Sequence, residues 1–196
     1  QLEIAIKSEN NKHQKTRMKY LLGQLYAQLG DKAKADKAFA SVKGMSTPYK
    51  YTFNAQLRQI ELDDSPAKTK ALSILSGMSK KPRNKEYLDQ IYYAIGNLYL
   101  SRKDTLKAME NYRLANQKST RNGIEKAICQ ITLGNLYFER REYVDAQPCY
   151  AEAIPQLKED YPQYDLLSRR SSVLDELVVY AQNVELQDSL QNLAAM

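Results

Sequence analysis

Few residues in this 196-residue chain have the types and spacing that catalysis requires. The single histidine, His13, lies in a polar stretch, where a solvated connector residue is a better interpretation than a catalytic base or metal ligand. The acidic pairs Asp63 with Asp64 and Glu159 with Asp160 lie at expected helix ends, where carboxylates commonly cap helices. No glycine-rich phosphate loop, HExxH motif or GxSxG motif occurs. The sequence therefore predicts a protein that is not an enzyme, with no cofactor and no metal site.

The two cysteines also have a structural interpretation. Cys129 and Cys149 are too few for a disulfide framework or a four-ligand zinc site. They fall on two helices that are expected to pair, so a bridge between them is conceivable. We favour the interpretation that they are two separate small packing residues.

Composition and charge narrow the class of protein. The chain is 43% hydrophobic and 27% charged, values typical of a folded globular protein, and no run of 18 apolar residues occurs. It begins with Gln1, and no signal-type segment precedes it, so we expect a piece of a longer protein whose targeting signals lie elsewhere. The net charge of +6 is uneven: residues 1–50 contain ten basic and four acidic residues, whereas residues 151–196 contain three and eight. This distribution can guide association with charged partners or between neighbouring modules.

The apolar spacing is helical along nearly the whole chain. Leu21, Leu22, Leu25 and Leu29 recur at intervals of three and four, and residues 88–99 follow the same rule. No segment alternates with a period of two for long enough to indicate a strand. Glycine, proline and asparagine separate segments of roughly 12–19 residues, the length of short helices. The sequence therefore predicts an all-α fold.

An internal repeat organises these helices. Gly23, Gly96 and Gly134 each follow a large apolar residue and precede a tyrosine by three positions. An alanine comes twelve residues after each glycine, and an aromatic residue comes four positions after the alanine. These pairs are Ala35 and Phe39, Ala108 and Tyr112, and Ala146 and Tyr150. This pattern resembles the tetratricopeptide repeat, a helix-turn-helix unit of about 34 residues. Small residues in it allow the two helices to approach, and the aromatic side chains fill the space between successive repeats.

The resemblance implies an α-solenoid with the following organisation. Residues 1–15 are the end of a preceding helix, and repeats occupy 16–49, 89–122 and 127–160. A degenerate repeat occupies 52–85, with Ala55, Ala71 and Leu75 at its small and large apolar positions and Gln59 in place of the glycine. Together they make four repeats over 16–160, and residues 161–196 form C-terminal capping helices, a longer one after Pro162 and a last one that contains Val184.

In such a solenoid the first helix of each repeat lines a concave face that binds protein segments. The inward positions predict a partner-binding set of Arg17, Tyr20, Gln24, Gln90, Tyr93, Asn97, Leu100, Ile128, Ile131, Asn135 and Phe138. In this set Asn97 and Asn135 can hydrogen-bond a ligand backbone, and Tyr93 and Phe138 offer apolar contact; the alternative is that they pack against the second helix. Chaperone-binding relatives place a lysine near such an asparagine to hold a terminal carboxylate, but this chain has Tyr93 and Ile131 there, which disfavours a carboxylate clamp.

Nucleic acid is not the expected partner. The chain has fifteen tyrosines and no tryptophan, but the repeat accounts for five of the tyrosines as packing residues, among them Tyr26, Tyr99 and Tyr137. The basic residues are dispersed over helix surfaces, as on a solvated face, rather than gathered into a groove.

The order of segments resembles a narrower group, the large repeat-containing lipoproteins of Bacteroidetes gliding motility and type IX secretion (the PorW/SprE type). The resemblance rests on residues 84–94, residues 136–138 with 143–147, residues 160–164, Leu177 with Val178, and residues 185–190 with 193–196. It implies a non-catalytic scaffold for protein transport, attached to the outer membrane by a lipid anchor outside this sequence and located in the periplasm. Its partners would be protein components of the secretion machinery.

Two other functions stay open at this stage. The first is an unrelated tetratricopeptide-repeat adaptor of the cytoplasm. The second is a non-catalytic arm of a larger enzyme or signalling protein. All three are protein-interaction roles, because the repeat provides a surface and no chemistry.

Overall fold

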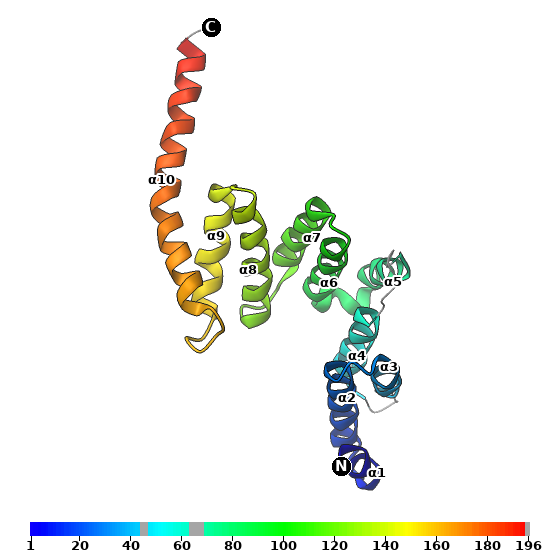
Figure 1. Ribbon diagram of the computed structural model, residues 1–196. Coiled ribbons are helices and arrows are strands. Elements are labelled where there is room, and N and C mark those ends of the chain that lie inside the picture. The colour runs from blue at the N-terminus through cyan, green and yellow to red at the C-terminus, as the bar shows by residue number, and fades with distance from the viewer. Residues whose placement is uncertain (44–46, 63–68, 195–196) are drawn as a thin grey trace. The chain divides into compact units, whose positions relative to one another are not determined.

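The computed structural model describes residues 1–43, 47–62 and 69–194, and these residues form helices and connecting turns without a strand (Figure 1). The all-α prediction is therefore confirmed. The acidic pair Asp63 and Asp64 lies outside the described residues. In chain order the elements are α1 Leu2–Ser8, α2 Lys12–Gln28, α3 Lys32–Ala40, α4 Tyr49–Glu61, α5 Thr69–Ser79, the 3-10 helix η1 Pro82–Tyr87, α6 Leu88–Ser101, α7 Thr105–Lys118, α8 Ile124–Glu139, α9 Tyr143–Ala153, the 3-10 helix η2 Ile154–Gln156, and α10 Tyr164–Ala194.

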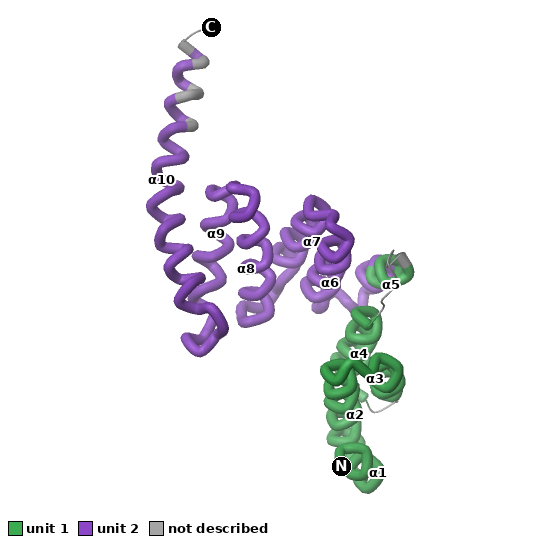
Figure 2. Tube along the Cα trace, viewed as in Figure 1, with its two compact units in different colours: residues 1–75 green, residues 76–196 purple. Residues whose placement is uncertain are grey.

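The chain divides into two compact units, Gln1–Leu75 and Ser76–Met196 (Figure 2). In the first unit α2 and α3 form an antiparallel pair, with α1 against α2 and α4 against both. In the second unit α6 pairs with α7 and α8 pairs with α9, and α10 packs along α9. Each pair coincides with one of the sequence repeats that begin at residues 16, 89 and 127.

A close approach between the two helices of each pair explains the glycine of the repeat. A Cβ atom placed on Gly96 would lie 2.5 Å from Cε1 of Tyr112, and one on Gly23 would lie 2.6 Å from the ring of Phe39. At Gly134 the nearest atom would be Cβ of Cys149, at 3.0 Å. At Gly23 and Gly96 only glycine leaves room for the aromatic ring against the backbone of the first helix, and at Gly134 a Cβ would make a tight contact. The three rings, of Phe39, Tyr112 and Tyr150, are buried.

The turn inside each pair also repeats. A residue with positive φ follows the first helix each time: Gly30 at 77°, Lys103 at 61° and Arg141 at 63°. The side chains of Asp31 and Asp104 then cap the second helix by accepting hydrogen bonds from the amides of Lys34 and Lys107, at 3.0 and 3.2 Å. The left-handed residue and the cap together fix the reversal of the chain.

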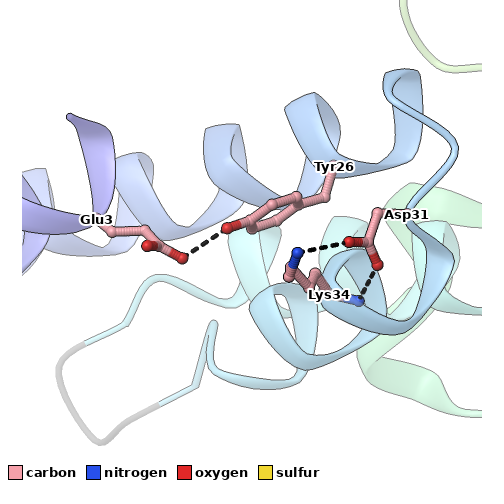
Figure 3. A network of polar contacts seen from close by, with 4 residues as sticks. All are labelled: Glu3, Tyr26, Asp31 and Lys34. Carbon is pink, nitrogen blue, oxygen red and sulfur yellow. Dashed lines mark hydrogen bonds and ion pairs between the residues drawn. The ribbon is translucent and has the colours of Figure 1, made fainter.

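In the first unit α1 is held against the α2–α3 pair by a polar contact (Figure 3). The hydroxyl of Tyr26 donates a hydrogen bond to Glu3 at 2.5 Å, and the ammonium of Lys34 lies 5.5 Å from the centre of the Tyr26 ring. The bond to Glu3 raises the pKa of Tyr26 above its ordinary value. Lys34 also forms an ion pair with the capping residue Asp31, at 2.8 Å. The tyrosine of the first repeat thus connects three helices of the unit.

The segment predicted as a degenerate repeat keeps its apolar positions buried. Ala55 lies in α4, and Ala71 and Leu75 lie in α5; all three are buried. Gln59, which replaces the glycine, donates a hydrogen bond from Nε2 to Oδ1 of Asp36 in α3, at 2.7 Å. A long polar side chain therefore fastens α4 to the preceding helix at the position where the other repeats have a glycine.

The C-terminal segment differs from the two helices expected from the sequence. A single helix, α10, runs from Tyr164 to Ala194, because that range contains neither glycine nor proline to end it. Leu167, Ser171 and Leu174 are buried, whereas most described side chains beyond Leu174 are exposed. At 1.5 Å per residue α10 is roughly 46 Å long and α9 is roughly 16 Å long. Much of α10 therefore extends past α9 (Figure 1).

The close approach at Gly96 predicts a specific cost for one added methyl group. The substitution Gly96→Ala should lower the free energy of unfolding by about 1–3 kcal/mol, because Tyr112 is fully buried and has no room to move. Gly77→Ala is the matched control: Gly77 is exposed on α5 and has no heavy atom within 4 Å of the added Cβ, so its replacement should stabilise by roughly 0.5–1 kcal/mol. Urea unfolding followed by circular dichroism measures both. Equal effects of the two substitutions would contradict the packing role of the glycine.

Candidate functional site: the inner residues of the first helices

The three predicted partner-binding residues of the first unit lie on α2. Arg17 is exposed, and the ring of Tyr20 lies against Phe39 with 5.6 Å between ring centres. Gln24 lines a pocket of about 310 Å³ together with residues of α3 and α4, among them Phe39 and Arg58. The structure thus gives Tyr20 a packing role and leaves Arg17 and Gln24 accessible to a partner.

In the second unit the predicted residues of α6 surround Tyr112. The Tyr112 hydroxyl donates a hydrogen bond to Oδ1 of Asn97 at 2.7 Å, and the ring of Tyr93 lies 5.5 Å from that of Tyr112. Burial raises the pKa of Tyr112 far above its ordinary value, so its hydroxyl stays a donor. Leu100 is half-buried, and Gln90 lines a separate pocket of about 260 Å³ that also contains Arg121.

The predicted residues of α8 repeat this arrangement around Tyr150. The Tyr150 hydroxyl donates to Oδ1 of Asn135 at 2.7 Å, in the same geometry as the bond between Tyr112 and Asn97. The ring of Phe138 packs edge-on against Tyr143, with centres 5.5 Å apart, and Ile128 is half-buried. Ile131 is 8% exposed and therefore offers almost no surface to a partner.

A residue that the sequence did not single out completes this cluster. The guanidinium of Arg170, on α10, donates to Oδ1 of Asn135 at 2.8 Å and to the Tyr150 hydroxyl at 3.0 Å. It lies 4.4 Å from the centre of the Phe138 ring, within the range of a cation–π contact. No carboxylate in the part of the chain that the structure describes forms an ion pair with it. The cluster therefore combines a half-buried cation with an aromatic ring and an amide.

The repeat spacing points to a position close to Arg170, but one helical turn further along α10. The asparagines at 97 and 135 are 38 residues apart, and the same step leads to Val173. Arg170 lies three residues earlier, on the turn of α10 that packs next to Phe138 and Tyr150. From there its long side chain reaches Asn135 on α8.

The cysteines are free thiols: Cys129, on α8, is buried, and Cys149, on α9, is half-buried. Burial raises the pKa of Cys129 and of Cys149 to about 12. A thiol with so high a pKa is protonated at neutral pH and is a poor nucleophile or metal ligand. Among residues 1–43, 47–62 and 69–194, no group of three or more histidine, cysteine or acidic side chains is arranged to hold a metal ion. Within the same residues no helix is both long and apolar enough to cross a membrane.

Comparison with known families identifies the repeat. A sequence model described as the tetratricopeptide repeat matches residues 16–46 and 89–117, which fall within the windows predicted at 16–49 and 89–122. These matches and the helical architecture establish an all-α solenoid of tetratricopeptide repeats. No curated protein matches the chain. Tetratricopeptide repeats are modules for protein–protein interaction, and this coarse function applies to the chain.

The hydrogen-bond cluster predicts different costs for two equivalent asparagines. Asn135→Ala removes the acceptor of both Tyr150 and Arg170, so it should destabilise by about 1–2 kcal/mol. Asn97→Ala removes the acceptor of Tyr112 alone, and Asn97 is exposed, so it should cost about 0.5–1 kcal/mol. Urea unfolding of the two variants measures the difference. A larger cost at Asn97 would contradict the cluster as described.

Burial of the two thiols predicts slow chemical modification. In the native protein at pH 8 both cysteines should react with a disulfide reagent such as DTNB at least about 100-fold more slowly than in urea-unfolded protein, because their raised pKa leaves little thiolate. Cys129 should be the slower of the two, since it is also buried. Release of the coloured thiol product measures the rate, and two equivalents should appear after unfolding. Rapid labelling of the folded chain would show that the α8–α9 pair opens readily.

Proposed function

We propose that this chain is a non-catalytic scaffold of type IX secretion and gliding motility, and that it holds another protein along the inner residues of α6, α8 and α10. The partner segment would contact Asn97 and Tyr93 on α6, then Phe138 on α8 and Arg170 on α10. Its location would be the periplasmic face of the outer membrane, with lipid attachment outside this sequence. The resemblance of residues 84–94, 136–138 and 143–147 to repeat lipoproteins of the PorW/SprE type supports the secretion context.

The observation that carries the proposed binding site is the state of Arg170. Its guanidinium is held in place by Asn135, Tyr150 and Phe138, yet its positive charge is not neutralised by a carboxylate of the described residues. Buried or half-buried cations are normally paired, because removing a charge from water costs free energy that an opposite charge restores. A partner that brings an acidic side chain or another anionic group to this point would supply the missing charge.

The surface around Arg170 supports a protein partner over a small molecule. The neighbouring side chains of the cluster, Phe138 and Asn135, come from a helix other than that of Arg170, and Asn97 extends the same pattern onto α6. An aromatic ring, amides and an oriented guanidinium spread over several helices match the extended contact that a peptide segment makes. Arginine and aromatic residues also contribute most to the energy of protein interfaces.

Charge at Arg170 offers a direct test with a matched control. A cell that carries this protein would receive a tagged copy with Arg170→Gln, and a parallel strain would receive Arg169→Gln, the exposed neighbour on the same helix. Arg170→Gln should reduce recovery of ring and translocon proteins in a quantitative cross-linking pull-down by about 10-fold or more, as expected for an interface arginine worth at least 1.4 kcal/mol. Arg169→Gln should leave the recovery unchanged, and melting curves should confirm that both variants fold.

Two results would contradict the proposal, and they are distinguishable. Equal recovery with wild type and Arg170→Gln would rule out the inner cluster as the contact site. Recovery of no secretion component even by wild type, with other proteins captured instead, would rule out the type IX context and leave a scaffold of another system.

A further inference from the structure

Two helices of this chain expose apolar stripes with opposite charge around them. The first, here named the α10 stripe, consists of Val173, Leu177, Tyr180 and Val184, spaced by four, three and four residues along one side of the helix. All four side chains are exposed, Tyr180 by 69%. Beyond Leu174 this part of α10 extends past its packing partner α9, and no described element of its unit covers it there (Figure 2). A helix surface so apolar is normally covered by another helix.

The second surface, here named the α2 stripe, consists of Leu21, Leu25 and Leu29, spaced by four residues. These side chains are also exposed, Leu29 by 79%. The repeat shows that this side of the helix is built for packing. Leu25 lies two residues after the repeat glycine, and the residues at the same position in the second unit, Leu98 and Leu136, are 6% and 8% exposed. At its centre, Leu25, the α2 stripe thus exposes a position that both repeats of the second unit bury.

The charges around the two stripes are complementary. Residues 12–28 of α2 include four basic residues and no acidic one, whereas residues 171–184 of α10, which contain the α10 stripe, include the acidic residues Asp175 and Glu176 and no basic one. None of the basic residues of α2 forms an ion pair with a described residue, and the same holds for Asp175 and Glu176. Two copies of α10 would repel each other, and so would two copies of α2. An α10 stripe against an α2 stripe satisfies both surfaces.

We infer that the α10 stripe of one copy of this chain docks on the α2 stripe of a second copy. The two stripes are of similar length, about 12 Å for Leu21–Leu29 and about 16 Å for Val173–Val184 at 1.5 Å per residue. The docked α10 buries Leu25, whose equivalents Leu98 and Leu136 are already buried within the second unit. Because the two stripes differ, the contact is heterologous: each copy still has one free stripe of each kind, and association continues beyond a dimer unless the contacts close on themselves.

Sedimentation velocity of the purified chain tests this inference. The weight-average sedimentation coefficient should rise with concentration up to about 100 μM, as expected for a small interface. It should fall back toward the monomer value when the salt concentration is raised from about 0.05 M to about 0.5 M, because the acidic and basic surfaces are then screened. A monomer at all concentrations in low salt would overturn the inference, whether the stripes stay free or are covered by other proteins.

Variants of each stripe assign the contact. The double substitution Tyr180→Lys with Val184→Lys should abolish self-association, and so should Leu25→Glu with Leu29→Glu. These side chains are exposed, so circular dichroism and the unfolding midpoint should stay near those of wild type. Mixing the two variants should restore a 1:1 dimer and nothing larger, because one variant keeps an intact α2 stripe and the other keeps an intact α10 stripe.

A matched control lies on the same helix. Val179 and Leu190 are exposed on a different side of α10, so Val179→Lys with Leu190→Lys should associate like wild type. Equal loss in this control would overturn the assignment of the α10 stripe. If the α2 variant still associated by itself, and mixing it with the α10 variant formed no 1:1 dimer, the contact would be a symmetric one between two copies of α10. That result would overturn the heterologous contact.

Discussion

The contact between a glycine on the first helix of a pair and an aromatic ring on the second is the constraint on which this structure depends. At Gly23 and Gly96 the ring lies where a Cβ atom would otherwise be, and at Gly134 an added Cβ would crowd Cβ of Cys149 and the Tyr150 ring. The alanine four residues before the ring is fully buried in each pair. These small residues set the distance between the helices. The same small residues recur in three pairs, so each pair closes around an apolar interior, as the units of repeat proteins do.

The same aromatic residues connect packing with function in the second unit. Tyr112 and Tyr150 fill the interior with their rings and place their hydroxyl groups beside Asn97 and Asn135. Arg170 donates a second hydrogen bond to the same Oδ1 atom of Asn135. The position of Arg170 depends on the packing of α10 against α9. The first unit lacks this polar extension, because Phe39 has no hydroxyl group. The candidate binding cluster therefore belongs to the second unit alone, although the fold of the pairs is common to both.

Residues in equivalent positions of this chain differ in how far they are buried. Leu98 and Leu136 are buried, whereas Leu25, in the same repeat position, is exposed. On α10 the residues that face α9 are buried and the apolar residues beyond α9 are not. Such differences arise from the position of a helix in the array rather than from its residue types. They explain why equivalent residues can serve as core in one repeat and as an interaction surface in another.

The sequence by itself determined the helical fold, the repeat and its packing residues, because these depend on local periodicity and on small residues at fixed spacing. It also placed Asn97 and Asn135 at the same position of two successive repeats, on the predicted inner face. It predicted two C-terminal helices where the structure has one. Residues 164–194 contain neither glycine nor proline, so nothing in that range ends the helix. Only the tertiary structure decided that the asparagines accept hydrogen bonds from tyrosines, that Ile131 is buried, and that Arg170 joins them. Those facts depend on how far a side chain reaches across a helix interface, which spacing along a chain does not encode.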